Sequence, residues 1–316
     1  MDAETFYNLP LTEIAQQVRA AGTKVCAFPV KGTRRWFMLE HPSPSPKDYA
    51  SAYLNAVFTR HIALYKLIFD HGIETLLTPS FDMPLMERGD AYMRMAAEGL
   101  AALTTHPLFQ NFYDAYGVRV RFYGEYRQYL AGTPYAYLLD LFDALTARTQ
   151  KHDRHRLFFG LFVHDAAETI ANLAVCYYRE HGSTPDKQAL VEAYYGEAVT
   201  PVDIFIGFSK LRVFDMPLLM MGKTDLYFTV SPSLYLNQQQ LRAILYDHLY
   251  ARRASSQSDY SALPAEEQAL IKSFYDANME STLGIGTWNP QWQFWYPLPQ
   301  VHLPPALIEK QKRGES

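Results

Sequence analysis

The sequence predicts an α/β protein with a central, mostly parallel six-stranded sheet flanked by helices. Short apolar runs of strand length alternate with longer stretches whose apolar residues recur at helical spacing. Gly and Pro residues separate these segments. The chain of 316 residues is 48% hydrophobic, which is enough for a substantial core. Because helices separate consecutive strands, we expect parallel pairing through right-handed crossovers.

The strands are expected where short apolar or alternating runs are bounded by turn residues. The first run, residues 25–30, is stopped and turned by Pro29 and Gly32, and the second run, 73–78, is closed by Pro79. The remaining strands are expected at residues 118–123, 157–163, 204–206 and 226–230.

The helices are expected where apolar residues return to the same face. Leu11, Ile14 and Val18 share the face of a helix at residues 11–21. The Pro-rich stretch 42–46 is expected to be a loop before the longest helix. The helices after that loop are expected at residues 47–70, 86–103, 109–116, 135–149, 166–179, 186–195, 238–252 and 265–276.

The chain reads as one domain over residues 1–297 with a flexible tail at 298–316, because no linker or repeat divides it. No signal-peptide core and no run of membrane-spanning length is visible, so a cytoplasmic protein without a transmembrane segment is expected. Cys26 and Cys176 stand alone in apolar surroundings, which favours buried thiols in a reducing compartment. The basic residues are scattered, so no nucleic-acid partner is expected.

Residues 28–37 are the first candidate for function. They place Lys31, Arg34 and Arg35 together after the first strand, beside Trp36. Ligands of open α/β sheets bind at the carboxyl ends of the strands, and guanidinium groups bind phosphate oxygens in pairs. The stretch therefore indicates an anion pocket with an aromatic wall. The alternative is a solvated basic turn with Trp36 in the core.

Short motifs spread along the chain resemble those of the cis-prenyltransferases, the family of undecaprenyl diphosphate synthase. The closer resemblance is to an atypical branch of that family, the tuberculosinol, tuberculosinyl adenosine and kolavelool enzymes, and it covers roughly residues 8 to 287. The motifs are GTRRWF at 32–37, HGIET at 71–75, YGE at 195–197, GKT-LYFTV at 222–230 and ILYDH-Y at 244–250.

The resemblance implies a diterpene synthase that releases diphosphate from a bicyclic twenty-carbon allylic substrate of the kolavenyl or tuberculosinyl type. Water would quench the cation to a tertiary diterpene alcohol such as kolavelool. A magnesium (Mg²⁺) cofactor and a homodimer are also implied. Two alternatives stay open, namely transfer of the diterpenyl group to a nucleoside, and a non-catalytic subunit that binds a prenyl diphosphate.

The resemblance also assigns roles to individual residues. Arg34 and Arg35 match the diphosphate-binding arginines of the family, and Tyr49 and Tyr92 match tyrosines that line the active site. A tyrosine can offer its π-face to a cation or place a water with its hydroxyl, although half-buried helix tyrosines are the alternative. The full diphosphate-binding set is Lys31, Gly32, Arg34, Arg35 and Arg212, and the catalytic set is Tyr49, Tyr92 and Asp215.

Two departures from the family bear on metal and substrate. Lys31 stands where cis-prenyltransferases carry an Asp that serves magnesium, and a protonated lysine cannot bind a metal. The segment 207–212 lacks most of the second diphosphate site, so elongation with isopentenyl diphosphate is not expected. The metal ligands therefore stay unassigned, with Asp82, Asp90 and Asp215 as candidates and Asp215 the strongest. The run 152–156 is expected to be a polar linker rather than a metal cluster.

Overall fold

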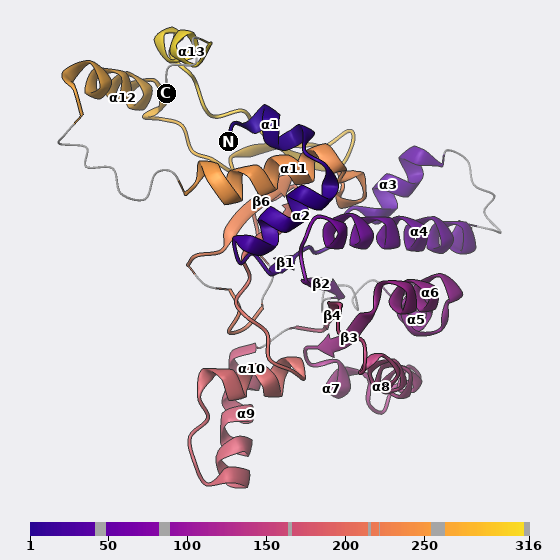
Figure 1. Ribbon diagram of the computed structural model, residues 1–316. Coiled ribbons are helices and arrows are strands. Elements are labelled where there is room, and N and C mark those ends of the chain that lie inside the picture. The colour runs from indigo at the N-terminus through magenta and orange to yellow at the C-terminus, as the bar shows by residue number, and fades with distance from the viewer. Residues whose placement is uncertain are drawn as a thin grey trace.

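The centre of the protein is a sheet of six parallel strands in the order β3-β4-β2-β1-β5-β6. The computed structural model describes residues 1–41, 49–81, 89–163, 166–213, 216–220, 222–253 and 263–312 (Figure 1). The strands are β1 (Val25–Ala27), β2 (Thr75–Phe81), β3 (Val118–Tyr123), β4 (His155–Leu161), β5 (Ile204–Phe208) and β6 (Asp225–Thr229). The predicted fold class is therefore confirmed.

Helices cover both faces of the sheet. Figure 1 shows α4, α5, α6 and α8 on one side and α9 and α10 on the other. The helices are α1 (Ala3–Asn8), α2 (Leu11–Ala20), α3 (Thr33–Glu40), α4 (Tyr49–Asp70), α5 (Asp90–Thr105), α6 (Pro107–Tyr116), α7 (Tyr126–Leu130), α8 (Tyr137–Thr149), α9 (Ala166–His181), α10 (Lys187–Tyr195), α11 (Gln238–Tyr246), α12 (Ala265–Asn278) and α13 (Pro305–Lys312).

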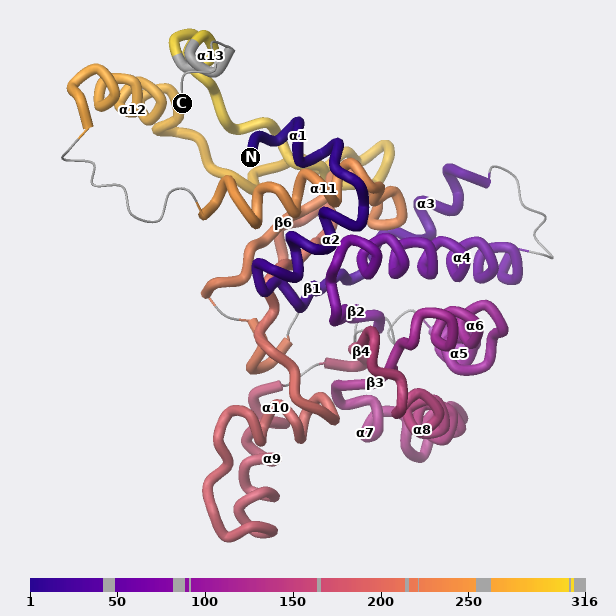
Figure 2. Tube along the Cα trace, viewed as in Figure 1, coloured from indigo at the N-terminus to yellow at the C-terminus, as the bar shows by residue number. Residues whose placement is uncertain are grey.

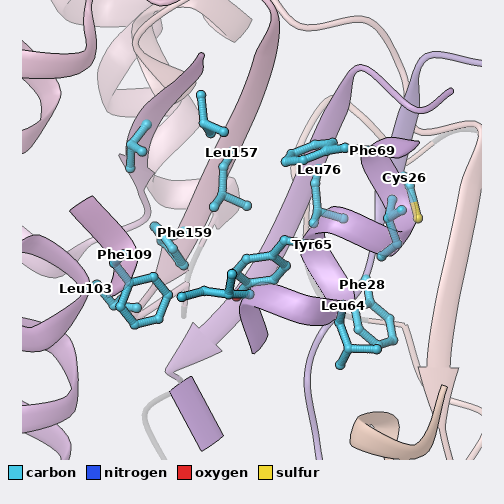
Figure 3. Packing of buried hydrophobic residues seen from close by; sticks show 14 of the residues in the cluster. Cys26, Phe28, Leu64, Tyr65, Phe69, Leu76, Leu103, Phe109, Leu157 and Phe159 are labelled. Atoms are coloured by element: carbon cyan, nitrogen blue, oxygen red, sulfur yellow. The ribbon is translucent and has the colours of Figure 1, made fainter. Parts of the chain in front are cut away.

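Neighbouring residues of each strand belong to two different cores, because side chains alternate across a sheet. Cys26 of β1 and Phe159 of β4 pack in the larger core with α4 and α6, whereas Ala27 and Phe158 pack in the smaller core with α10. Figure 3 shows part of the larger core, where strand side chains meet Tyr65 of α4 and Phe109 of α6. The strands β1 to β5 are thus largely buried on both sides, as parallel sheets usually are, whereas the edge strand β6 is half-exposed.

The basic stretch after β1 is a helix and not the turn that the sequence analysis expects. β1 ends at Ala27, and Gly32 caps α3 in the left-handed conformation with φ of 77°. The amide of Trp36 then donates to the carbonyl of Gly32, at 2.9 Å, and begins the helical bonding. Trp36 is buried, as the alternative interpretation expects, and this burial fixes which side of α3 faces outward.

Pro79 does not close the second strand but lies inside β2, opposite Gly160 of β4. The pairing of β1 with β2 has already ended at Ala27 and Leu77. Among the described strands, one edge of β2 therefore has no partner at Pro79, and a residue without an N–H group is tolerated there. β2 therefore continues past Pro79 and ends at Phe81.

Several smaller expectations also need correction. The run 152–156 is only partly a linker, since β4 begins at His155, whose ring stacks on Phe69 at 4.3 Å between ring centroids. Cys26 is buried as expected, but Cys176 is exposed on α9. The helices of the described residues lack the combination of length and apolar character needed to cross a bilayer.

The sequence analysis did not predict the hairpin in the C-terminal part of the chain. A two-stranded antiparallel hairpin, β7 (Gly286–Asn289) and β8 (Phe294–Pro297), follows α12. Figure 2 shows that α12 and α13 lie away from the central sheet. The single domain over residues 1–297 and the flexibility of the tail stay predictions.

Candidate active site

The turn between β1 and α3 is held from two sides. The amide of Lys31 donates to the hydroxyl of Ser233 at 3.1 Å, and the amide of Ser233 donates back to the carbonyl of Lys31 at 3.1 Å. Arg60 of α4 in turn donates to the carbonyl of Leu234 at 2.6 Å. The position of Lys31 is therefore fixed by backbone hydrogen bonds to a segment two hundred residues later in the chain.

Gly32 has both a conformational and a steric reason to be glycine. Its φ of +77° is one that other residues adopt at a cost. A Cβ atom there would lie 2.9 Å from the ring of Phe208 and 3.0 Å from Pro232. The close approach brings the ends of β1 and β5 together at the start of α3.

A polar cavity of about 450 Å³ lies at the carboxyl ends of β1, β2 and β5. Three of its lining residues are cations, and the guanidinium of Arg34 lies 4.6 Å from the ring centroid of Tyr92. The guanidinium of Arg35 lies 5.5 Å from the ring of Phe294 in the C-terminal hairpin. The lining residues are Val30, Lys31, Gly32, Thr33, Arg34, Arg35, Tyr53, Ser80, Tyr92 and Phe208.

An apolar cavity of about 170 Å³ adjoins the polar one between α4, α5 and the sheet. The two cavities have five lining residues in common, namely Val30, Thr33, Tyr53, Ser80 and Tyr92. The other lining residues are Leu54, Val57, Phe58, His61, Tyr65, Phe81, Met95, Ala96, Gly99, Leu100, Leu103 and Phe159. A ligand with an anionic head and a large apolar body would find a matching surface for each part.

The structure brings four of the five expected diphosphate-binding residues to this place. Lys31, Gly32, Arg34 and Arg35 all line the polar cavity. Arg212 does not line either cavity and is exposed on the segment that follows β5. A cation-lined cavity thus lies where the anion pocket is expected after the first strand, and Arg212 lies outside it.

Of the two expected catalytic tyrosines, only Tyr92 lines the cavities. Tyr49 is one helical turn before Tyr53 on α4, and their rings stack at 6.2 Å between centroids. It is Tyr53 that lines both cavities, and its hydroxyl hydrogen-bonds to that of Thr33 at 2.7 Å. The sequence analysis missed Tyr53. A signal was present, because residues four apart share a helix face.

The hydroxyl of Tyr53 stays protonated at neutral pH. Burial raises its pKa, and the hydrogen bond with Thr33 and the charge of Arg34 offset only part of that effect. Burial likewise lowers the pKa of His61, in the wall of the apolar cavity, to about 4. Both groups are therefore neutral beside the cationic cavity.

A magnesium site is not formed by the part of the chain that the structure describes. The described residues that line the polar cavity include no carboxylate, and no group of three or more His, Cys, Asp or Glu side chains suited to a metal occurs among the described residues. Asp90 is the first residue of α5. Asp82 and Asp215, the latter also an expected catalytic residue, lie outside the described residues.

The adjacent residues Asp247 and His248 lie at the opposite edge of the sheet. The His248 ring nitrogens hydrogen-bond to the Asp225 carboxylate at 2.6 Å and to the Thr23 hydroxyl at 2.9 Å. The hydroxyl of Tyr227 donates to Asp247 at 2.7 Å. Thr23 precedes β1 and Asp225 begins β6, so this network joins the starts of strands to the π-helical turn Asp247–Ala251 that follows α11, and not to the cavities.

The fold and the paired cavities define an α/β protein of the cis-prenyltransferase type. A solved lavandulyl diphosphate synthase of Lavandula x intermedia, in complex with dimethylallyl diphosphate, superposes with a TM-score of 0.51 at 14% identity, over 72% of this chain and 95% of that one. A probable undecaprenyl diphosphate synthase of Campylobacter jejuni superposes with a TM-score of 0.52 at 12% identity, with the same two coverages.

Sequence relatives narrow the assignment, although no family model matches the chain. A tuberculosinyl adenosine transferase of Mycobacterium tuberculosis is 43% identical over 282 residues, which are 89% of this chain and 94% of that protein. A (+)-kolavelool synthase of Herpetosiphon aurantiacus is 26% identical over 301 residues, or 92% and 94% of the two chains. The chain belongs to the family of these two enzymes, as the sequence motifs imply.

Proposed function

We propose that the protein is a diterpene synthase that ionises a bicyclic allylic diphosphate of twenty carbons and captures the cation with water. The observation that carries the proposal is the junction of a cation-lined cavity with an apolar one at the carboxyl edge of the sheet. The names of the two relatives supply the diterpenyl class of the substrate. The product would be a tertiary diterpene alcohol such as kolavelool.

In this proposal the cations of the β1–α3 segment carry the first step. Lys31, Arg34 and Arg35 hold the diphosphate and stabilise the negative charge that develops on it as the carbon–oxygen bond breaks. Both electrons of that bond leave with the diphosphate. The aromatic rings of Tyr53 and Tyr92 lie where the two cavities meet and can stabilise the allylic cation.

Water completes the reaction. Its oxygen forms a bond to the tertiary carbon of the allylic cation, and the proton it loses passes to the released diphosphate. The hydroxyls of Tyr53, Thr33 and Ser80 lie in the wall shared by the cavities and can position that water. Magnesium is retained as the proposed cofactor from the resemblance, but the described residues offer it no carboxylate in the cavity, and we assign it no step.

Transfer of the diterpenyl group to a nucleoside nitrogen is the second candidate. The relative that is 43% identical is named for that reaction with adenosine. The third alternative, a non-catalytic subunit that binds a prenyl diphosphate, is favoured only by Lys31 in place of the family aspartate.

The proposal includes a homodimer in the cytoplasm. Large apolar side chains are exposed along the C-terminal segment, which is the kind of surface that a second copy covers. Those side chains include Tyr275, Met279, Leu283, Ile285, Trp288, Trp292, Leu298, Val301 and Leu303.

The test is incubation with kolavenyl and tuberculosinyl diphosphates in heavy-oxygen water, with magnesium and with or without adenosine. An alcohol that carries the heavy oxygen in both mixtures supports the proposed function. A diterpenyl adenosine formed only when adenosine is supplied would move the assignment to the transferase. Tight binding of both substrates without any turnover would favour the non-catalytic subunit.

A further inference from the structure

Each of the two arginines of the polar cavity lies over an aromatic ring from a different part of the chain. The guanidinium of Arg34 lies over the ring of Tyr92 of α5, 4.6 Å from its centroid. That of Arg35 lies over the ring of Phe294, 5.5 Å from its centroid. Phe294 is the first residue of β8, so the C-terminal hairpin reaches a cation of the cavity although Phe294 does not line the cavity itself.

The face of the hairpin that carries Phe294 is aromatic. Side chains alternate across a strand, so Phe294 and Tyr296 lie on one face of β8 and Trp295 on the other. The ring of Phe294 lies 6.3 Å from that of Trp292 and 5.5 Å from that of Tyr296, between centroids. On the other face the ring of Trp295 lies so close to Gly286 that a Cβ atom there would collide with it. Ring contacts on both faces therefore restrict the orientation of Phe294.

The hairpin is attached to the end of β5, which also contacts the start of α3. The hydroxyl of Ser209 donates to the carbonyl of Trp295 at 3.4 Å. Phe208, the residue before Ser209, is the one whose ring closes on Gly32. Ser209 has a φ of 64°, which is costly for a residue with a side chain and persists where the surrounding structure enforces it. The end of β5 thus connects the hairpin to the helix that carries the two arginines.

Arg35 is exposed, and among the described residues the structure gives it neither a hydrogen bond nor an ion pair. An exposed arginine without a contact samples many rotamers, and ordering such a side chain when a ligand binds weakens the affinity by a factor of about two to twelve. A ring over the guanidinium reduces that cost. It covers the face of the group and leaves the N–H donors at its edges available to phosphate oxygens. The ring of Phe294 can therefore order Arg35 without competing for its ligand.

We propose that Phe294 is a positioning residue, which holds the Arg35 guanidinium at the polar cavity so that the diphosphate meets a cation that is already ordered. The C-terminal hairpin is then part of the active site. This role requires an aromatic face and not merely an apolar side chain, which distinguishes it from general packing. The inference rests on the proposed function, because it assumes that Arg35 binds the diphosphate.

The experiment measures binding of geranylgeranyl thiolodiphosphate, an unreactive analogue, by calorimetry. Its apolar body keeps binding measurable when one charge contact is removed. Phe294→Leu is expected to weaken binding about two- to five-fold, the range set by a cation–π contact at an exposed site. Phe294→Tyr keeps the aromatic face and is expected to keep the native affinity. Trp288→Leu is the control and is expected to bind as the native protein does, because it removes an exposed ring from the other face of the same hairpin.

A double-mutant cycle separates positioning from packing. If Phe294 acts through Arg35, Phe294→Leu has no further effect on binding in an Arg35→Ala background. The inference is overturned by native binding in Phe294→Leu or in Arg35→Ala, by additive losses in the double variant, or by equal losses in Phe294→Leu and Phe294→Tyr. In each of those cases, binding that is still lost in Arg34→Ala leaves the proposed function standing. If the native protein does not bind the analogue, both fail together. Thermal unfolding confirms that each variant is folded, and Phe294→Ile, which suits a strand, replaces Phe294→Leu if the latter does not fold.

Discussion

Tyr53 and Tyr49 offer a matched pair of substitutions that tests the site. Tyr53→Leu removes the ring that lies in the wall of both cavities, and Tyr49→Leu removes a ring of the same size one helical turn earlier. Both rings also pack edge-on against Phe37, at 5.4 and 5.5 Å between centroids. Both variants lose the contact with Phe37, and Tyr53→Leu loses more packing because Tyr53 is buried and Tyr49 half-buried, but only Tyr53→Leu removes an aromatic face from the site.

The magnitude follows from the role proposed for the ring. A desolvated contact between an aromatic face and a cation contributes about 2 kcal/mol. Loss of that amount from the transition state lowers the rate about 30-fold. We therefore expect Tyr53→Leu to lower kcat/KM by about 30-fold and Tyr49→Leu to change it little. Tyr53→Phe keeps the ring and is expected to lose mainly the hydrogen bond to Thr33, about 1 kcal/mol of stability.

The assay is steady-state alcohol formation from kolavenyl diphosphate, with thermal unfolding to confirm that each variant is folded. A larger loss in Tyr49→Leu than in Tyr53→Leu would refute the assignment of Tyr53 and return the catalytic role to Tyr49. Equal losses that track the change in melting temperature would show that both rings act only through packing.

Three further predictions concern charge. Arg34→Ala and Arg35→Ala should each lower turnover on the order of a hundred-fold with the fold intact, and near-normal activity in both would remove the diphosphate from the polar cavity. Lys31→Ala should raise the magnesium concentration for half-maximal rate, because the attraction between Lys31 and the diphosphate is worth roughly 4 kcal/mol at an effective dielectric near 20. Lys31→Asp should instead steepen the magnesium dependence. Magnesium titrations of both variants that overlay the native curve would contradict this. Burial, with Arg154 and Arg19 nearby, lowers the pKa of His155 to about 4, so its contribution to stability is present above about pH 6.5 and lost as the pH falls toward 4. Denaturant unfolding across that range should show a loss on the order of 3 kcal/mol that His155→Phe lacks.

The central fold was predictable because its signals are local. Alternating or continuous apolar runs and intervening helical periods located all six strands of the sheet to within a few residues. The prediction that Pro79 ends the second strand was wrong. Whether a strand can contain a proline depends on where the neighbouring strand ends, which is not a local property of the sequence. The hairpin β7–β8 was missed because its two short strands, GTWN and FWYP, show neither an apolar run nor a clear alternation of apolar and polar residues.

The basic part of the site was predictable for a similar reason. Lys31, Arg34 and Arg35 lie close together in the chain at the end of a strand, so the topology of an α/β sheet already places them at the ligand edge. The choice between Tyr49 and Tyr53 was not predictable in this way. Residues four apart share a helix face, so the sequence does not tell which turn of α4 reaches the cavities.

The helical form of residues 33–40 changes the physical basis of the proposed anion pocket while keeping its location. A turn would offer scattered N–H groups, but α3 begins at the polar cavity with Gly32 and Thr33 among the lining residues. The first amides of a helix lack intrahelical partners, and the helix dipole favours negative charge at that end. The side chains of Arg34 and Arg35 add full charges beside the same amides. Burial of Trp36 and Phe37 on the opposite side then orients this whole set, so the aromatic pair acts on the pocket by positioning the helix rather than by forming its wall.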